Sequence, residues 1–321
     1  MLTRDQYWNA TSDFTVWCLR GVGQVMLQDN AITGLVFLIG IFISDWVSGL
    51  YAILGTAVAT ASAWLFGAPS DKVRHGLAGF NGTLTGIGLA FSLEHDALLF
   101  VYVIVASVFV TIVTAAIKDI FGAKGYPLTG PFVLTTWIFV SPLLSYERLH
   151  GAAALGAQHA LSGAVPTFTQ LSITDLGAGF LNGVAQVMLQ QNALTGAIFL
   201  VAIAINSRLS CAVAALGSLI GLGVALLLGA APIAISEGLF GFNGVLTAIA
   251  IGGVFFPMRA LTAVLAVLAV CVSTILYGSF SSAFALLQVP VLTAPFVLTT
   301  WLFLLAKGTL SELREESSIP R

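Results

Sequence analysis

Long runs of apolar residues without a charged side chain constrain the fold of this chain more than any other feature. Such runs cover Trp46–Ser70, His75–Leu93, Ala97–Ile117, Leu209–Ser236, Gly238–Met258 and Ala260–Ala306. Most of them reach the ~20 residues that a helix needs to cross a bilayer, and they are apolar on all sides, unlike the alternating strands of a membrane barrel. Only 8% of the 321 residues are charged, against about 25% in soluble domains. The sequence therefore predicts an all-α polytopic membrane protein.

The chain contains two copies of one sequence. Residues 21–34 and 183–196 are identical at eleven of fourteen positions, and the same offset of 162 residues relates the two Gly-Phe-Asn-Gly segments at 79–82 and 241–244. Near the end of each copy, residues 128–137 and 292–301 are identical at nine of ten positions. These matches indicate a tandem duplication. We expect a first repeat at 1–147, a polar connector at 148–174, a second repeat at 175–307 and a cytoplasmic tail at 308–321.

Each half divides into six apolar pieces, which in the first half cover residues 14–30, 31–45, 48–67, 73–92, 97–118 and 131–146. The first piece is the most polar, because it contains Arg20, Gln24 and Gln28, and we expect it to be re-entrant. Five crossings then remain per half, and an odd number inverts the second repeat relative to the first. The expected architecture is two inverted repeats of about five transmembrane helices plus a re-entrant segment each, with a pore at the interface between the repeats.

Basic residues test this topology, because cytoplasmic loops collect lysine and arginine. In the five-crossing arrangement ten of the twelve basic residues fall on one side: Arg4, Lys72, Arg74, Lys118, Lys124, Arg208, Arg259, Lys307, Arg314 and Arg321. The acidic residues Glu94, Asp96, Glu147 and Glu237 fall on the other side. Both termini are then cytoplasmic. If piece 73–92 were re-entrant and piece 14–30 crossed, Lys72 and Arg74 would lie opposite Lys118 and Lys124, so this alternative is less favoured.

Thr129 and Thr293 occupy equivalent positions, each two residues before a proline. Proline has no N–H to donate, so we expect nearby carbonyls without helical partners, and such acceptors are tolerated in a membrane only where they are buried in protein or line a polar path. The alternative is a hydroxyl that bonds back to its own helix. The adjacent prolines favour a path-lining role.

Gln24 and Gln186 are also equivalent, and each places an amide among apolar side chains. The simplest interpretation is a hydrogen bond between helices. The duplication instead favours a place at each end of a path, because inverted copies bring one glutamine towards each face.

The two Gly-Phe-Asn-Gly segments interrupt apolar runs with glycine, which permits close backbone approach and unwound helix. Such breaks at corresponding positions of two halves are the best sequence indication of a membrane binding site. Phe80 and Phe242 are therefore candidate walls of a slot, and Leu84 and Leu246 follow one helical turn later on the same face. The alternative is a tight turn in which phenylalanine only fills space.

A slot with phenyl and isobutyl walls, edged by hydroxyls and carbonyls, suits a flat, neutral solute with several N–H donors. The repeated motifs contain no ionisable residue except Arg20 and Asp29, whereas coupled transporters usually place ionisable groups at mid-membrane. Ion coupling is therefore not favoured.

The sequence lacks the signatures of other function classes. It contains no His-Glu-x-x-His, no Gly-x-Ser-x-Gly and no phosphate-binding loop, so we do not expect an enzyme. Cys18, Cys211 and Cys271 have no metal or redox spacing, and we expect no cofactor or metal. No basic patch indicates nucleic acid.

The segment Pro290–Phe296, which reads Pro-Val-Leu-Thr-Ala-Pro-Phe, resembles the Leu-Pro-x-x-Thr-x-Pro-Phe signature of the urea transporter family, with Val289 in place of the leucine. The duplicated glutamine and Gly-Phe-Asn-Gly blocks resemble that family too, so the likeness covers nearly the whole chain. The resemblance implies passive, channel-like transport of urea through ten spanning helices in two inverted repeats. It also implies a pore inside each subunit and a homotrimer in the cell inner (plasma) membrane.

The resemblance also implies roles for individual residues. Thr129 and Thr293 would form the central constriction with Leu84 and Leu246, Phe80 and Phe242 would be slot walls, and Gln24 and Gln186 would face the outer path. Two features differ from the family pattern. The first signature copy, at residues 126–132, is one residue shorter, and Leu27 and Leu189 stand where family members commonly have phenylalanine, so part of the slot is expected to have aliphatic walls.

Three hypotheses remain for function. The favoured one is passive transport of urea or a closely related small neutral amide. The second is an ion-coupled secondary transporter of a small polar solute on the same repeats, and the third is a membrane scaffold that transports nothing.

Overall fold

A computed structural model describes residues 4–122, 126–153, 171–285, 287, 289–307 and 309. The described part of the chain is helical, and its one strand-like pairing is an isolated bridge between Leu93 and Gly151. The predicted all-α class is confirmed. Lys124, most of the connector and nearly all of the expected tail lie outside the described residues.

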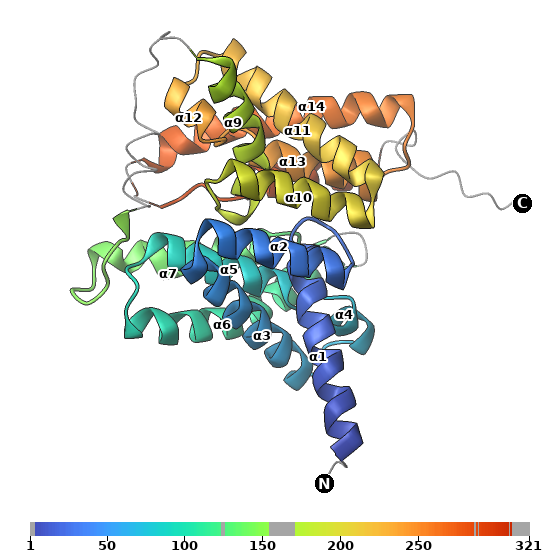
Figure 1. The fold of residues 1–321 in the computed structure, drawn as a ribbon, viewed down its shortest axis with the longest axis vertical. Helices are drawn as coiled ribbons and strands as arrows, with labels where there is room; N and C mark the ends of the chain where they lie inside the picture. Colours follow the sequence, from blue (N-terminus) through green and yellow to red (C-terminus); the bar gives the residue numbers. More distant parts are fainter. Residues whose placement is uncertain are drawn as a thin grey trace, which may run out of the picture.

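The helices form two sets, one from each half of the chain, stacked along the longest axis of the molecule (Figure 1). The first set is α1 (Arg4–Gln24), α2 (Ala31–Ser44), α3 (Trp46–Leu65), α4 (Ser70–Arg74), α5 (Phe80–Ser92), α6 (Ala97–Phe121), α7 (Gly130–Val140) and η2 (Ser141–Leu144). The second set is α9 (Ile173–Ala185), η3 (Gln186–Met188), α10 (Ala193–Asn206), α11 (Arg208–Leu227), α12 (Pro232–Ser236), α13 (Phe242–Ile249), η4 (Ala250–Val254), α14 (Ala260–Phe284) and α15 (Ala294–Ala306).

The two sets correspond in order and often in length. Helices α2 and α10 have 14 residues each, α3 and α11 have 20, and α6 and α14 have 25. Equivalent residues also begin equivalent helices, since the side chains of Asn30 and Asn192 accept hydrogen bonds from the first-turn N–H groups of α2 and α10. The sequence duplication is therefore a structural duplication as well.

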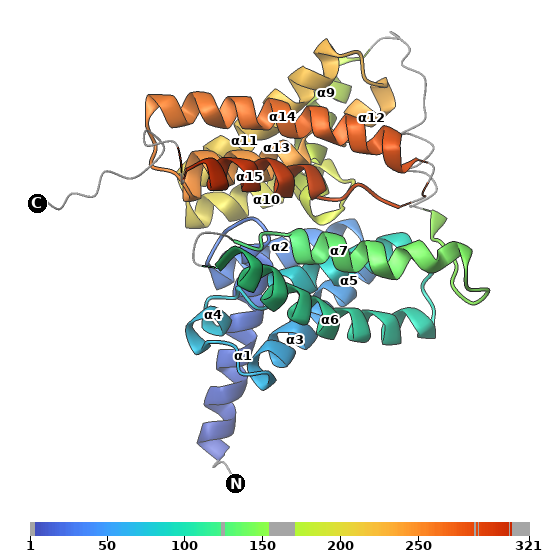
Figure 2. The same cartoon turned by 180° about the vertical axis from the view of Figure 1, so that it is seen from behind.

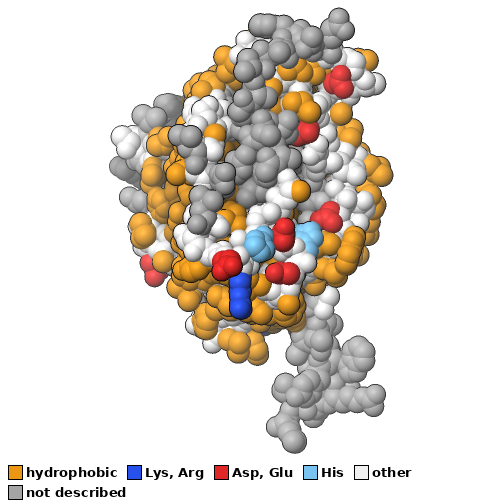
Figure 3. Space-filling model, turned by 90° about the vertical axis from the view of Figure 1, so that its left-hand side faces the viewer, with side chains coloured by type: hydrophobic (Ala, Val, Ile, Leu, Met, Phe, Trp, Pro, Cys, Tyr) orange, Lys and Arg blue, Asp and Glu red, His pale blue; other side chains and the backbone are white. Residues whose placement is uncertain are grey.

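Within the described residues, four helices are long and apolar enough to cross a membrane, namely α3, α6, α11 and α14. Residues 173–188 and α10 pass the same test as a pair that bends by 70°. Figure 3 shows the end of the molecule that lies on the left of Figure 1, where acidic, basic and histidine side chains gather while hydrophobic side chains cover the flanks. Hydrophobic flanks and charged side chains at the end of the bundle are the distribution expected of a polytopic membrane protein.

Several other apolar helices are shorter than a full crossing. Helix α15 has 13 residues, or about 20 Å at 1.5 Å per residue, but the non-helical residues 289–293 that precede it are buried as well. Half-helices joined to unwound segments are typical of membrane transport proteins. Ten full-length helical crossings are thus not present in the described residues, because part of the depth is covered by backbone that is not helical.

Two of the expected pieces differ from continuous helices. Piece 73–92 is divided into α4 and α5, and Gly76 between them has a φ of +73° and lies where a Cβ would approach the backbone N of Gly21 within 2.3 Å. Piece 14–30 is the end of α1 and a turn through Leu27, which has a φ of +59°. Both candidates for a re-entrant segment are therefore broken. The first break lies directly before the Gly-Phe-Asn-Gly segment at 79–82, where the sequence indicated unwound helix.

Contacts between the halves are reciprocal. The hydroxyl of Thr33 donates to the carbonyl of Ala202 at 2.8 Å, and the equivalent hydroxyl of Thr195 donates to the carbonyl of Gly40 at 2.9 Å. The rings of Phe37 and Phe199, also equivalent, meet edge to face with centroids 5.0 Å apart. An interface in which each contact is made twice with exchanged partners has two-fold symmetry.

Helices α6 and α14 run in opposite directions (Figure 2). The end of α6 and the start of α14 lie at the same end of the bundle (Figure 2), where Phe121 packs against Trp301 of α15 and Tyr126 packs against Phe255, which precedes α14. The other ends also meet, because Phe284, the last residue of α14, packs against the apolar cluster that contains Leu99 near the start of α6.

Candidate functional site: the central constriction

Thr129 and Thr293 meet at the centre of the molecule. Their side-chain oxygens are 2.7 Å apart and form a hydrogen bond in which either hydroxyl can donate. Both residues are only 2% exposed, and each immediately precedes a short helix, α7 or α15. The structure thus joins two residues that are 164 positions apart in the sequence.

The prolines act differently from the sequence-based expectation. Pro131 and Pro295 are the second residues of α7 and α15, where a proline costs little because the first turn of a helix has no internal acceptors for its N–H groups. No helix is interrupted there. The expected row of unpaired carbonyls is wrong, because a sequence does not reveal whether helix precedes a proline or only follows it.

The carbonyls before the threonines are instead paired with side chains. Asn81 Nδ2 donates to Leu128 O at 3.1 Å, and Asn243 Nδ2 donates to Leu292 O at 3.4 Å. Indole N–H groups bind two further carbonyls, Trp137 that of Pro290 at 2.8 Å and Trp301 that of Tyr126 at 2.9 Å.

Asn81 and Asn243 are functional candidates that sequence reasoning missed. Each also accepts a hydrogen bond on Oδ1, from Phe132 N at 3.2 Å and from Phe296 N at 3.0 Å respectively. Each amide therefore joins the Gly-Phe-Asn-Gly segment to both sides of the turn that carries a threonine. The repetition of the asparagine in both halves was the available signal. The sequence could not show which groups it binds, because those partners lie about fifty residues away.

The apolar site candidates lie in or against one large buried cluster. Leu84, Leu246 and Phe242 belong to one buried cluster that extends through both halves. Phe80, Leu27 and Leu189 are partly buried and pack against the same cluster.

The two candidate wall residues have different surroundings. Phe242 is buried and meets the edge of Tyr277 with ring centroids 5.4 Å apart. Phe80 is half-buried. Phe242 is thus more enclosed than its counterpart Phe80 in the first repeat.

Gln24 and Gln186 lie away from the constriction. Gln24 Nε2 donates to the carbonyl of His75, just after α4, at 2.9 Å. Gln186 Nε2 donates to the carbonyl of Glu237, just after α12, at 3.2 Å. Figure 2 shows α4 and α12 at opposite ends of the molecule. The glutamines therefore lie at opposite ends. The simplest interpretation proposed a hydrogen bond between helices, and each amide instead binds a carbonyl of the turn that follows α4 or α12.

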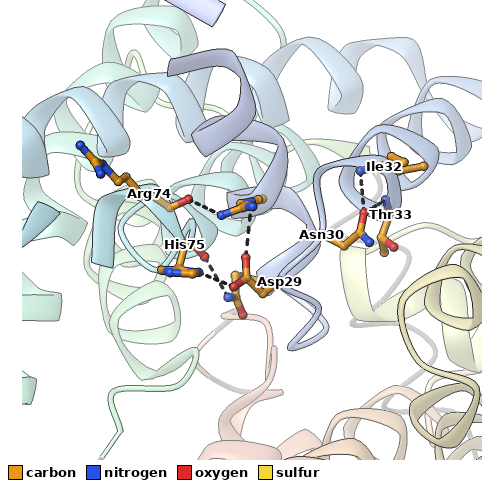
Figure 4. Close-up of polar contacts among 8 residues, drawn as sticks. Asp29, Asn30, Ile32, Thr33, Arg74 and His75 are labelled. Atoms are coloured by element: carbon orange, nitrogen blue, oxygen red, sulfur yellow. Dashed lines mark hydrogen bonds and ion pairs between the residues drawn. The ribbon is translucent and has the colours of Figure 1, made fainter. Parts of the chain in front are cut away.

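The two ends differ in charge. Beside Gln24, Asp29 pairs with the imidazole of His75 and with Arg20 at 3.6 Å, and Arg20 also donates to the carbonyl of Arg74 (Figure 4).

Neutral groups replace two of these charges in the second repeat. Asn182 stands at the position of Arg20, Gln191 at that of Asp29 and Glu237 at that of His75. Burial raises the pKa of the Glu237 carboxyl, and a hydrogen bond from Gln191 opposes that rise. Among the described residues, no group of three or more His, Cys, Asp or Glu side chains is close enough to hold a metal ion.

The fold and the site together define a membrane transport protein: duplicated half-helices meet at a buried polar pair inside an apolar bundle. The sequence model of the family described as "Urea transporter" matches residues 15–308. The chain is 33% identical over 297 residues to Urea transporter 1 of Rattus norvegicus, and this match covers 91% of the chain and 77% of that protein. Urea transporter 1 of Capra hircus is 32% identical over 296 residues, with the same coverage. The chain belongs to the urea transporter family.

Replacement of Asn81 or Asn243 by leucine should destabilise the protein, because each change leaves a buried carbonyl and a buried N–H without partners, at about 1–3 kcal/mol for each group. Thermal unfolding in detergent measures the loss. Ser279→Leu is the control, because Ser279 is exposed on α14 and its hydroxyl donates to the carbonyl of Ile275 in the same helix. Equal unfolding temperatures for Asn81→Leu and Ser279→Leu would show that the buried asparagines do not hold the turns.

Proposed function

We propose that this protein is a transporter that passes urea, or a closely related small neutral amide, down its gradient through a path inside the subunit. The hydrogen-bonded pair Thr129 and Thr293 carries this proposal. Family membership supports it, as do the names of the relatives.

The pair is suited to a neutral solute with both donors and acceptors. A hydroxyl donates one hydrogen bond and accepts up to two, so a solute with a carbonyl and amino groups can replace the bond between the threonines with bonds to itself. The buried Leu84 and Leu246 add no polar group that would hold the solute afterwards. Weak binding of this kind allows conduction.

We also propose that the two repeats are inverted in the membrane, with boundaries as expected from the sequence. The opposite directions of α6 and α14 support inversion. The basic residues Lys118 and Lys307 lie at one end of the bundle, over the ring of Tyr126 and bonded to the carbonyl of Phe255 respectively. By the positive-inside rule this end is cytoplasmic.

The assembly and location that we propose are a homotrimer in the cell inner membrane with both termini cytoplasmic. They rest on the family resemblance and on the distribution of basic residues in the sequence.

One observation supports the second hypothesis, an ion-coupled transporter. The group of Arg20, Asp29 and His75 places ionisable side chains at one end of the path, and coupled carriers use such groups. The contacts of these side chains with the turn after α4 equally suit a structural role.

Purified protein in liposomes should carry urea at a rate that rises linearly with its gradient and does not respond to sodium or proton gradients. Flux of urea, acetamide, formamide, glycerol and water is compared with that of empty liposomes. Accumulation of urea against its gradient when sodium or protons are supplied would establish coupled transport instead. No flux of any of these solutes would support the scaffold hypothesis.

Thr129→Val and Thr293→Val should each lower urea flux by about tenfold. Valine keeps the volume but leaves the opposite hydroxyl without its partner, at a cost on the order of 1–3 kcal/mol. The double variant should be nearly inactive, because no hydroxyl remains to bind the solute. Thr111→Val is a control, since Thr111 is half-buried on α6 and bonds to backbone carbonyls of α3 and α6. Wild-type flux in a correctly inserted double variant would refute the role of the pair.

Single cysteines at Glu94 and Arg259 should react with impermeant thiol reagents from opposite faces, in a background without Cys18, Cys211 and Cys271. Both positions are exposed, and they serve better than the buried Gln186. Labelling is compared in intact cells and inverted vesicles. Labelling of both from one face would contradict the inverted arrangement and the five-crossing count.

A further inference from the structure

We infer that Trp137 and Trp301 are positioning residues that set the spacing and direction of the two threonine hydroxyls, and thereby the selectivity of the constriction. The inference rests on the proposed function. Its basis is a pair of hydrogen bonds that cross from one half of the molecule to the other.

The two bonds are reciprocal. Trp137, late in α7, donates to Pro290, three residues before Thr293, and Trp301, late in α15, donates to Tyr126, three residues before Thr129. Each short helix therefore begins directly after its own threonine. About two turns later, its tryptophan binds the segment that precedes the other threonine.

These segments need external support. Leu128 and Leu292, directly before the threonines, have φ values of +52° and +54°, which cost about 1–2 kcal/mol for a side chain other than glycine. Such a conformation persists only where the surroundings determine it from several sides. The asparagine of the same half binds the carbonyl of each leucine, and the tryptophan of the opposite half binds the carbonyl two residues earlier.

The tryptophan rings also have fixed positions. Trp137 meets the edge of Phe284 with centroids 5.2 Å apart, and Trp301 packs on Phe121 at 4.8 Å. Both tryptophans are only partly exposed. An indole held by a neighbouring ring keeps its N–H directed at one carbonyl.

The one difference between residues 128–137 and 292–301 lies at this contact. Gly130 follows Thr129 where Ala294 follows Thr293. A Cβ at Gly130 would lie 3.1 and 3.2 Å from two ring atoms of Trp301, which is closer than ordinary van der Waals contact. The ring of Trp301 therefore rests directly against the residue after Thr129, and it touches the turn on both sides of that threonine.

A tryptophan that only stabilised the fold would not need an N–H aimed at the threonine segment of the opposite half. Two such bonds with exchanged partners fix the separation of the threonines, because a shift of either short helix moves both segments. Urea, with two amino groups, depends more on two aligned hydroxyls than acetamide, which has one.

The test compares Trp137→Phe, Trp301→Phe and the double variant with wild type in liposomes. Phenylalanine keeps an aromatic ring but lacks the N–H, so the carbonyl of Pro290, which is buried, or that of Tyr126, which is exposed, loses its donor. We expect the double variant to carry urea about tenfold more slowly, with a lower ratio of urea to acetamide permeability and smaller effects in the single variants. Trp64→Phe is the matched control, because Trp64 is 59% exposed on the outside of α3.

Gly130→Ala provides a variant that removes no polar atom. It should displace the Trp301 ring by a few tenths of an ångström and lower the urea to acetamide ratio in the same direction, which a merely structural loss of stability would not do. If the double variant fails to insert, the single variants and Gly130→Ala decide. A wild-type ratio in the inserted tryptophan variants overturns the inference, whereas absence of urea flux in wild type overturns the proposed function instead.

Discussion

The structure depends on the need to pair every backbone N–H and carbonyl that is removed from water. In a membrane a helix meets this need within itself, and a segment that leaves the helix must find partners elsewhere. Here the turns before α7 and α15 are not helical, although they lie inside an apolar bundle. Asparagine amides and tryptophan indoles supply the missing donors. The two non-helical turns that carry the threonines therefore depend on these four side chains.

The same side chains leave the threonine hydroxyls with little else to bind. The carbonyls of Leu128 and Leu292, directly before the threonines, accept from asparagine amides, and the two hydroxyls bind each other. A polar pair in apolar surroundings is stable only as long as it stays paired, so a solute that replaces the bond must offer equivalent bonds. This requirement favours neutral amides over apolar solutes, which offer none, and over ions, for which no opposite charge stands at the pair.

The sequence was sufficient for the class of fold, whereas the roles of the site residues stay predictions. Uncharged runs predicted the membrane helices, and the offset of 162 residues predicted the correspondence of α1–α5 with α9–α13. The repeated threonines bind each other, and the repeated leucines belong to one buried cluster. The asparagine and tryptophan partners were not predicted, although both are repeated, because a hydrogen bond between distant segments leaves no local pattern.

Local geometry explains the remaining errors. Residue propensities do not predict the left-handed conformation of the leucines at 27, 128, 189 and 292, because tertiary contacts impose that conformation on an isolated leucine. The glycines at 79–82 indicated an interruption near the break between α4 and α5, but its exact place depends on how closely Gly76 approaches the backbone of α1.

The reciprocal contacts between the halves use residues that both halves possess. Thr33 and Thr195, Phe37 and Phe199, Thr129 and Thr293, and Trp137 and Trp301 are identical pairs, so either half alone holds both sides of the contact surface. A chain of half this length would therefore meet a second copy of itself through the same bonds and enclose the same constriction as a homodimer. The differences between the ends, such as His75 opposite Glu237, are those that only a fused chain can acquire, because two identical copies must carry the same side chain at both ends of the molecule.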